Sequence, residues 1–515
     1  TSATTASDNV GVGHGALSAL TTSTRNVAIG TQALNGAMNT NSTTYNVAVG
    51  YHAGNDVTTG IRNTIMGGLA GDALTTGSYN QALGYSALGT ETGGSRSTAI
   101  GYLALGIQNV GSGEANNVAI GHSAGGAVTS GIQNVLIGSL TGDALTTGGF
   151  NVAIGYNALS TEDAHGTNVA IGKSALQNLN AGANAYNVAV GFEAGLSVST
   201  GTHNTLMGGL AGDALTTGAE NVAIGYLALS TEDAHGRNVA VGNNALRDLN
   251  AGANGLNVAI GYDAGLAMTT GTNNTIIGAL AGDALTTGSY NVAIGRNALS
   301  AEDAHGTNVA VGYDTLALQN AGADAYNTAV GYAAGVNVST GVQNTLIGGQ
   351  AGDALTTGGF NTAVGFAALT TEDAHGYNTA MGYRALHNLD AGANGYNVAV
   401  GVDAGLTMTT GINNTIIGGL AGDAFTTASG SVALGYNALG STTTAIENIA
   451  IGINALVTNV DGGKNVAVGS YALTALDPAS AANTYNVAVG HQAGTAMTTG
   501  VTNTLIGALS GDSIT

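Results

Sequence analysis

The feature that most constrains this chain is a five-residue motif, Asn-x-Ala-x-Gly, which recurs along the whole sequence. Near the middle it occupies Asn151–Gly155 and Asn168–Gly172, and then, with Thr-Leu in place of x-Ala in the last copy, Asn187–Gly191 and Asn204–Gly208. The spacings between successive copies are 17, 19, 17 and 17 residues, which together make a super-repeat of 70 residues. Repetition at such a short period is typical of solenoids, in which each unit packs only against its neighbours.

The whole chain can be divided into copies of this unit. From Asn9 to Asn503 there are 29 copies; Gly is fifth in all 29, Asn is first in 27 and Ala is eighth in 26. Residues 151–430 form four near-identical super-repeats, whereas residues 1–150 and 431–515 are divergent coils. We therefore expect one continuous solenoid with three sequence segments.

Within a copy, β-branched residues lie two apart, which is the period of a strand. The unvarying Gly indicates a corner with a positive φ or a close backbone approach. We expect a second short extended segment over 156–159 and a return turn over 160–166, where small and polar residues predominate. The prediction is an all-β protein, a parallel β-solenoid (β-roll) of about 29 coils of 17–21 residues, with stacked Asn side chains forming a hydrogen-bonded ladder.

Both faces of the predicted strand are apolar. Val152 and Ile154 point to one face and Ala153 to the other, and in every fourth coil that Ala is replaced by a larger residue such as Leu206 or Ile276. Because the internal core of a solenoid uses one strand face, we expect the second face to pack against another chain.

The motif Asn-Val-Ala-Ile-Gly-x-x-Ala resembles the head repeats of trimeric autotransporter adhesins and similar Asn-Thr-Ala-Ile-Gly-Tyr-x-Ala-Leu arrays of phage tail fibres. The resemblance extends over essentially the whole chain, although the coils here are longer and no membrane anchor or coiled-coil stalk is present in this sequence. It implies a left-handed β-roll and a homotrimer, and it favours a phage or other surface fibre over an autotransporter proper.

Charge and composition restrict the partners. The net charge is -21 with only nine Lys and Arg, which argues against nucleic acid and anionic lipid. No apolar run is long enough to span a bilayer, so we expect no membrane insertion. The absence of Cys is compatible with the extracellular location, at a cell surface or on a virion, that the resemblance implies.

Candidate ligand-binding residues end the longer loops. A Tyr closes four of these loops, and Tyr suits stacking on sugars and hydrogen bonding to them. The alternative is that each Tyr only covers the edge of its coil. The four residues are Tyr186, Tyr326, Tyr396 and Tyr485.

Other motifs do not predict catalysis or a cofactor. Gly121–Gly125 matches Gly-x-Ser-x-Gly, but Ser123 occupies a position that varies freely among the coils and no helix is expected after it. The His residues of the Glu-Asp-Ala-His-Gly loops are 70 residues apart and cannot share a metal ion within one chain. Asp in the Ala-Gly-Asp-Ala motifs is expected to cap turns. We expect no enzyme activity, no cofactor and no metal site.

The sequence therefore predicts a non-enzymatic extracellular fibre: an adhesin, or the shaft or head of a phage tail fibre, which binds a glycan or protein receptor. The main alternative is a structural subunit of an extracellular filament or sheath, and stacked Thr residues leave an ice-binding or mineral-binding surface as a third. The last coil lacks a polar cap, so we expect the natural polypeptide to continue past Thr515 or this edge to stack on another subunit.

Overall fold

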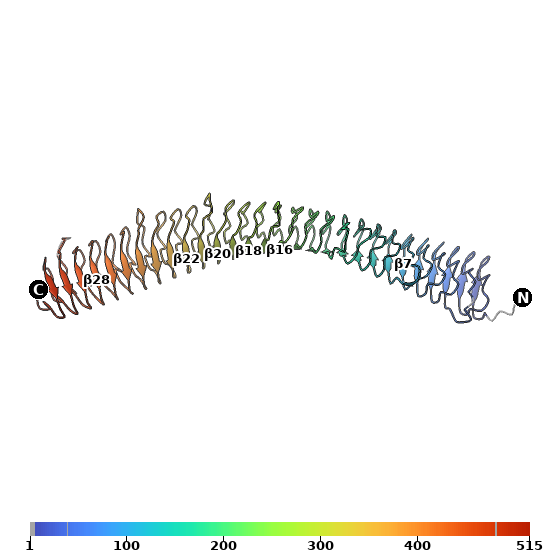
Figure 1. Cartoon of the computed structure of the whole chain (residues 1–515), viewed down its shortest axis with the longest axis horizontal. Helices are drawn as coiled ribbons and strands as arrows, with labels where there is room; N and C mark the ends of the chain where they lie inside the picture. Colours follow the sequence, from blue (N-terminus) through green and yellow to red (C-terminus); the bar gives the residue numbers. More distant parts are fainter. Residues whose placement is uncertain (1–5, 39, 479–481) are drawn as a thin grey trace. The chain divides into compact units, whose positions relative to one another are not determined.

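The computed structural model describes residues 6–38, 40–478 and 482–515, and every regular element in them is a β-strand. The protein is all-β and folds as a parallel β-solenoid of about 29 turns, as the repeat predicted. It contains two compact units, Thr1–Leu256 and Asn257–Thr515. In each unit every coil contributes one short strand to the main sheet and one return loop (Figure 1).

In the first unit the main sheet runs in chain order from β1 to β16, omitting β6 and β8, which pair with each other. The strands of the first unit, including this separate pair, are β1 (Val10–Val12), β2 (Val27–Ile29), β3 (Val47–Val49), β4 (Thr64–Met66), β5 (Gln81–Leu83), β6 (Gly94–Ser95), β7 (Thr98–Ile100), β8 (Gly113–Glu114), β9 (Val118–Ile120), β10 (Val135–Ile137), β11 (Val152–Ile154), β12 (Val169–Ile171), β13 (Val188–Val190), β14 (Thr205–Met207), β15 (Val222–Ile224) and β16 (Val239–Val241).

In the second unit the sheet runs in chain order from β17 to β31. Its strands are β17 (Val258–Ile260), β18 (Thr275–Ile277), β19 (Val292–Ile294), β20 (Val309–Val311), β21 (Thr328–Val330), β22 (Thr345–Ile347), β23 (Thr362–Val364), β24 (Thr379–Met381), β25 (Val398–Val400), β26 (Thr415–Ile417), β27 (Val432–Leu434), β28 (Ile449–Ile451), β29 (Val466–Val468), β30 (Val487–Val489) and β31 (Thr504–Ile506).

All of these strands pair in parallel and without slippage, so equivalent residues of successive coils lie side by side. In the pairing of β11 with β12, for example, Ala153 lies opposite Ala170. The side chains at each repeat position therefore form a column along the unit. A pattern that is regular in sequence becomes a regular surface in space.

The fifth-position Gly is required for both of the reasons predicted. Gly155 and Gly172 have φ angles of +134° and +138°, in a region that side chains disfavour. A Cβ atom on Gly172 would lie 2.1 Å from the carbonyl oxygen of Gly191 in the next coil. Gly191 and Gly208 repeat this geometry, with φ angles of +148° and +139°.

The Asn ladder is also confirmed, with backbone amides as its donors. The backbone N–H of Asn168 donates to Oδ1 of Asn151 at 3.0 Å, and that of Asn187 donates to Oδ1 of Asn168 at 3.1 Å. Asn204 continues the ladder on Asn187 at 2.9 Å. Nδ2 of Asn187 donates to the carbonyl oxygen of Gly201 at 2.8 Å, so Asn187 closes its own coil and also bonds to the next.

The predicted second extended segment is wrong. Residues 156–159 form turns, and Asn157 and Leu159 have φ angles of +55° and +52°. Their amides still bond between coils, since Asn157 donates to Ser139 at 3.2 Å and Leu159 to Ala175 at 3.0 Å. Inter-coil hydrogen bonds thus hold a left-handed conformation that costs roughly 1–2 kcal/mol per residue. The strand itself is also shorter than its five-residue motif, because Gly155 turns the chain.

The structure decides which strand face is internal. The third position of the unit, such as Ala153 or Leu206, is fully buried, as is the eighth position, such as Ala158. The twelfth position supplies a further buried column, represented by Leu145 and Val198. The core of each coil is thus a narrow layer of Ala and larger aliphatic side chains, and the second and fourth positions lie outside it.

Inside this core, the 70-residue period arises because one larger side chain at the third position is accompanied by smaller residues at the ninth position. Leu206 replaces the usual third-position Ala, and the ninth positions of its own coil and of the preceding coil are Gly212 and Gly195. A Cβ on Gly195 would lie 2.7 Å from Leu206 Cδ1, and one on Gly212 would lie 2.8 Å from Leu206 Cδ2. Leu176 occupies the ninth position elsewhere at a φ of +48°, so packing space, rather than backbone angle, excludes a side chain here.

We therefore predict that Gly195 and Leu206 are coupled. Gly195→Ala should destabilise the chain by about 1–3 kcal/mol through overpacking, and Leu206→Ala by about 2–5 kcal/mol through a cavity. The double variant should lose less than the two single losses combined, because the new methyl group partly fills the cavity. Urea unfolding of the four proteins gives the coupling energy, and strict additivity would contradict this account of the period.

Candidate interaction surface

The outward face of the strands is an apolar stripe. Its members are the second and fourth positions of each coil, such as Val152 and Ile154, which are half-buried. Ile224, Ile260 and Ile347 at the fourth position remain 36%, 39% and 39% exposed. Because the strands are in register, these side chains form an uninterrupted stripe along each unit. A surface of this kind is characteristic of an interface rather than of a solvated monomer.

Two columns of exposed aromatic residues border this stripe. The pre-strand column precedes the first residue of the motif, and the post-strand column follows the fifth-position Gly. Together they hold all but two of the 24 Tyr and Phe residues of the chain. The pre-strand column comprises Tyr45, Tyr79, Phe150, Tyr186, Tyr290, Tyr326, Phe360, Tyr377, Tyr396 and Tyr485. The post-strand column comprises Tyr51, Tyr85, Tyr102, Tyr156, Phe192, Tyr226, Tyr262, Tyr313, Tyr332, Phe366, Tyr383 and Tyr436.

Neighbouring rings within a column stack on each other. In the pre-strand column the ring centroids of Phe360 and Tyr377 are 4.9 Å apart, and those of Tyr377 and Tyr396 are 5.0 Å apart. In the post-strand column Tyr85 and Tyr102 stack at 5.6 Å. A stacked ring has at least one face covered by its neighbour and presents mainly its edge and hydroxyl group to solvent.

The four Tyr residues predicted from the loops all lie exposed in the pre-strand column. Tyr186 stacks on His203 at 5.4 Å, Tyr396 stacks on Tyr377, and the Lys464 ammonium lies 5.7 Å from the ring centroid of Tyr485. Tyr326 and Tyr396 are four coils apart, or about 19 Å at the usual strand spacing, so the structure does not gather them into one pocket. Their predicted role in ligand binding stays a prediction.

The few cations of the chain are also attached to these columns. Seven of the nine Lys and Arg side chains lie over an aromatic ring, with distances to the centroid between 4.8 and 6.0 Å. The other two, Arg237 and Arg247, form ion pairs with Glu220 and Asp248. The cations are therefore dispersed and individually paired, which is unlike the clustered basic surface that binds phosphate backbones.

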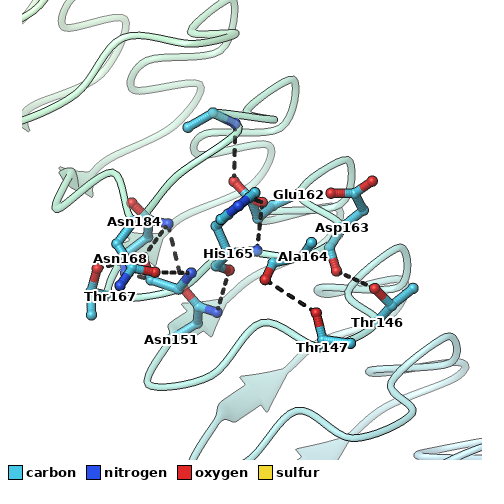
Figure 2. Close-up of polar contacts among 12 residues, drawn as sticks. Thr146, Thr147, Asn151, Glu162, Asp163, Ala164, His165, Thr167, Asn168 and Asn184 are labelled. Atoms are coloured by element: carbon cyan, nitrogen blue, oxygen red, sulfur yellow. Dashed lines mark hydrogen bonds and ion pairs between the residues drawn. The ribbon is translucent and has the colours of Figure 1, made fainter.

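The stacked Thr residues of the return turns use their hydroxyl groups between coils. Thr146 Oγ1 donates to the carbonyl oxygen of Asp163 at 2.7 Å, and Thr147 Oγ1 donates to that of Ala164 at 3.3 Å (Figure 2). These hydroxyl groups contribute to the cohesion of the solenoid.

Partly buried carboxylates recur three residues before the first Thr of such turns, once in each 70-residue period. One carboxylate oxygen in each of Asp143, Asp213, Asp283, Asp353 and Asp423 is buried without a hydrogen-bond partner. Burial raises the pKa of each of these carboxyl groups above its ordinary value, and the residue's own backbone N–H opposes the shift. The turn-capping role of these Asp residues stays a prediction, and their burial carries a cost of desolvation.

Four turns bring together residues able to hold a metal ion, and the sequence argument had not considered this combination. Each contains Glu, Asp and His from a Glu-Asp-Ala-His segment, with one potential ligand atom per residue within 4.8 Å of the others. The turns contain His165, His235, His305 and His375.

Ser123, in the Gly-x-Ser-x-Gly match, has a φ of +51°, and its counterparts Glu193 and Asp263 have φ angles of +54°. Its backbone conformation therefore belongs to the repeat. None of the described residues lies in a helix with the length and hydropathy needed to cross a bilayer.

Two features were not singled out from the sequence. One is the post-strand aromatic column, whose signal is an aromatic residue recurring directly after the fifth-position Gly. The other is the buried Glu at the twelfth position of five coils, whose signal is a charged residue in a column occupied mostly by Val, Leu or Met.

No family model matches the chain, and no curated protein matches it significantly.

The Asp column predicts a pH-dependent effect of Asp→Asn substitution at positions 143, 213, 283, 353 and 423. A raised folded-state pKa stabilises the protein below the unfolded value of about 3.9, and this contribution is lost as pH rises through the folded pKa. Asn resembles the protonated acid, so the fivefold variant should unfold at a higher temperature than the parent at pH 7 and at a similar temperature at pH 3.

Asp512→Asn is the matched control, because Asp512 has the same repeat position but is exposed in the last coil. Calorimetry at both pH values checks the prediction. A fivefold variant that is less stable than the parent at pH 7 would show that the carboxylates stabilise their turns in the charged form.

Proposed function

We propose that this protein is a non-enzymatic extracellular fibre that attaches to a cell surface or presents a tip to it, as an adhesin or as the shaft or head of a phage tail fibre. It would act as a homotrimer at a cell surface or on a virion. Its receptor would be a cell-surface glycan or protein.

The observation that carries this proposal is the outward apolar stripe. Apart from Gln81, each coil directs two side chains that are aliphatic, Met or Thr away from its own core, and these side chains are half-buried or exposed. Their burial in an assembly would gain roughly 25 cal/mol for each Å² of apolar surface removed from water. Since every coil repeats the same contact, the gain accumulates along the unit.

A cyclic assembly satisfies this geometry. If each chain presents its stripe to a common axis, one kind of contact buries all the stripes and leaves no apolar face exposed. The resemblance to trimeric adhesin heads and tail-fibre repeats supports three chains. In such an assembly the polar return loops lie outside and are available to a receptor.

The dispersed cations and the net charge of -21 support a receptor other than nucleic acid or anionic lipid. The aromatic columns supply exposed edges and hydroxyl groups that suit glycans and proteins.

To test the assembly, Ile154, Ile171 and Val190 of three adjacent coils should each be replaced by Asp. These side chains lie outside the core and are only half-buried in one chain, so the fold should remain while the mass measured by analytical ultracentrifugation falls from three chains toward one. The control variant carries Thr161→Asp, Asn178→Asp and Thr200→Asp. These three residues are exposed on the loops of the same coils, so the mass should not change. A folded parent that sediments as a single chain would overturn the trimer.

Receptor binding is tested on a glycan array and on immobilised cell-surface proteins. Replacing Tyr186, Tyr326, Tyr396 and Tyr485 by Ala should weaken binding by about tenfold or more, as expected when aromatic anchors are lost from an interface. Replacing four post-strand residues, Tyr156, Tyr226, Tyr262 and Tyr436, by Ala is the matched control. Equal losses in both variants would reject the predicted residues, and absent binding combined with end-to-end polymerisation would support the filament alternative.

A further inference from the structure

Each super-repeat contains one turn in which two carboxylates and one imidazole meet. In the first, the carboxylate of Glu162 and the imidazole of His165 face each other, and Asp163 lies at the adjacent bend (Figure 2). Glu162 is fully buried, His165 is about 30% exposed, and Asp163 is exposed. The same arrangement recurs at Glu232, Glu302 and Glu372, and Asp390 joins the last group.

The buried Glu is held rigidly by backbone amides. Its Oε1 accepts the N–H of the His three residues later at 3.0–3.2 Å in all four copies. In three copies its Oε2 accepts an Ala N–H of the next coil at 3.1–3.3 Å, from Ala181, Ala251 or Ala391. A carboxylate oxygen has two lone pairs, so Oε1 can still accept another partner.

The imidazole has an unused nitrogen directed at this carboxylate. In all four copies Nδ1 is buried and has no hydrogen-bond partner. Its distance to Glu Oε1 is 3.6, 3.5, 3.8 and 3.4 Å in chain order. These distances are long for a hydrogen bond. They are close to the separation of roughly 3.4 Å between two ligand atoms of a tetrahedral zinc ion with bonds of about 2.0–2.1 Å.

Another coil of the same chain has the buried Glu without the Asp and the His, and it shows which of these residues the turn needs. Glu91 has the same buried position, but Thr92 and Gly94 replace the Asp and the His. Its Oε1 still accepts the Gly94 N–H at 2.6 Å, and its Oε2 accepts the Val110 N–H at 3.2 Å. The turn therefore forms without Asp or His, so these two residues are not required for its hydrogen bonds.

We propose that each Glu-Asp-Ala-His turn binds one divalent transition-metal ion of the zinc class, through His Nδ1, a Glu oxygen and the adjacent Asp carboxylate. Imidazole with carboxylate is a donor set that suits zinc rather than calcium, which takes oxygen ligands only. The exposed Asp can rotate toward the ion, and water completes the coordination. Each chain would hold four ions, one per super-repeat.

The expectation that no metal binds had considered the His residues and the Asp of the Ala-Gly-Asp-Ala motifs separately, and not the two carboxylates beside each His. In the structure each His has its own pair of carboxylates, so no sharing is needed.

The test is a titration of the metal-free full-length chain with Zn²⁺ by isothermal calorimetry, with metal content measured after dialysis. We expect four equivalents per chain, and binding that weakens as the pH falls, because metal ligands must be deprotonated to bind. Co²⁺ should give the intense visible absorption of a tetrahedral site. The absorption reports on coordination at the turn independently of stability.

The test variant copies the turn at Glu91 into the four sites, by Asp→Thr at 163, 233, 303 and 373 together with His→Gly at 165, 235, 305 and 375. It should fold, as judged by circular dichroism, and lose all four equivalents; the change at one site alone should remove one. The control variant carries His→Asn at positions 52, 122, 203 and 491. It loses the same number of His residues outside the turns and should still bind four equivalents of Zn²⁺.

The proposal is overturned if the parent binds no Zn²⁺, or if the test and control variants lose equivalents alike, which would indicate adventitious binding by surface His. It is also overturned if the His→Gly substitutions change the stability of the chain equally with and without Zn²⁺. The turn would then hold only an ion pair between His and Glu.

Discussion

The structure depends on how closely successive coils approach each other at the fifth-position Gly. At this point a Cβ atom would lie only 2.1–2.4 Å from the carbonyl oxygen of the next coil for the Gly residues at 155, 172, 191 and 208. The approach lets the strands pair without slippage and aligns the Asn side chains, whose Oδ1 atoms accept the next coil's backbone N–H. The core columns, the outward stripe and the aromatic columns all follow from this alignment.

The same alignment explains why a chain with so many left-handed residues is stable. Leu159 and Leu176 have positive φ angles that an isolated chain would avoid. Their amides bond to the carbonyl oxygens of the adjacent coil, and their side chains are fully buried in the core. The conformational cost is offset by contacts that recur in every coil, so a corner that is unfavourable locally is favourable in the stack.

Each position of the coil also carries its own type of side chain along the solenoid. At the third position of the coil, neighbouring Gly residues leave room for one larger aliphatic residue per super-repeat. At the twelfth position, the core admits one buried Glu per super-repeat. That Glu caps a turn, and its neighbouring Asp and His form the potential metal site. The outward side presents aliphatic and aromatic columns, so assembly and recognition would use different surfaces from those that hold a coil together.

The sequence by itself determined the fold class, the number of coils, the strand position within each unit, the Gly corner and the Asn ladder. All of these depend on the repeat, and a repeat is visible without coordinates. The second extended segment was wrong because φ signs at Asn157 and Leu159 are set by hydrogen bonds to other coils, which propensity does not report. The sequence also showed that both strand faces are apolar, but only the tertiary structure decided that Ala153 faces inward and Val152 and Ile154 face outward. The physical reason is that the narrow core admits a methyl group at the third position, and a larger side chain only beside ninth-position Gly residues such as Gly195.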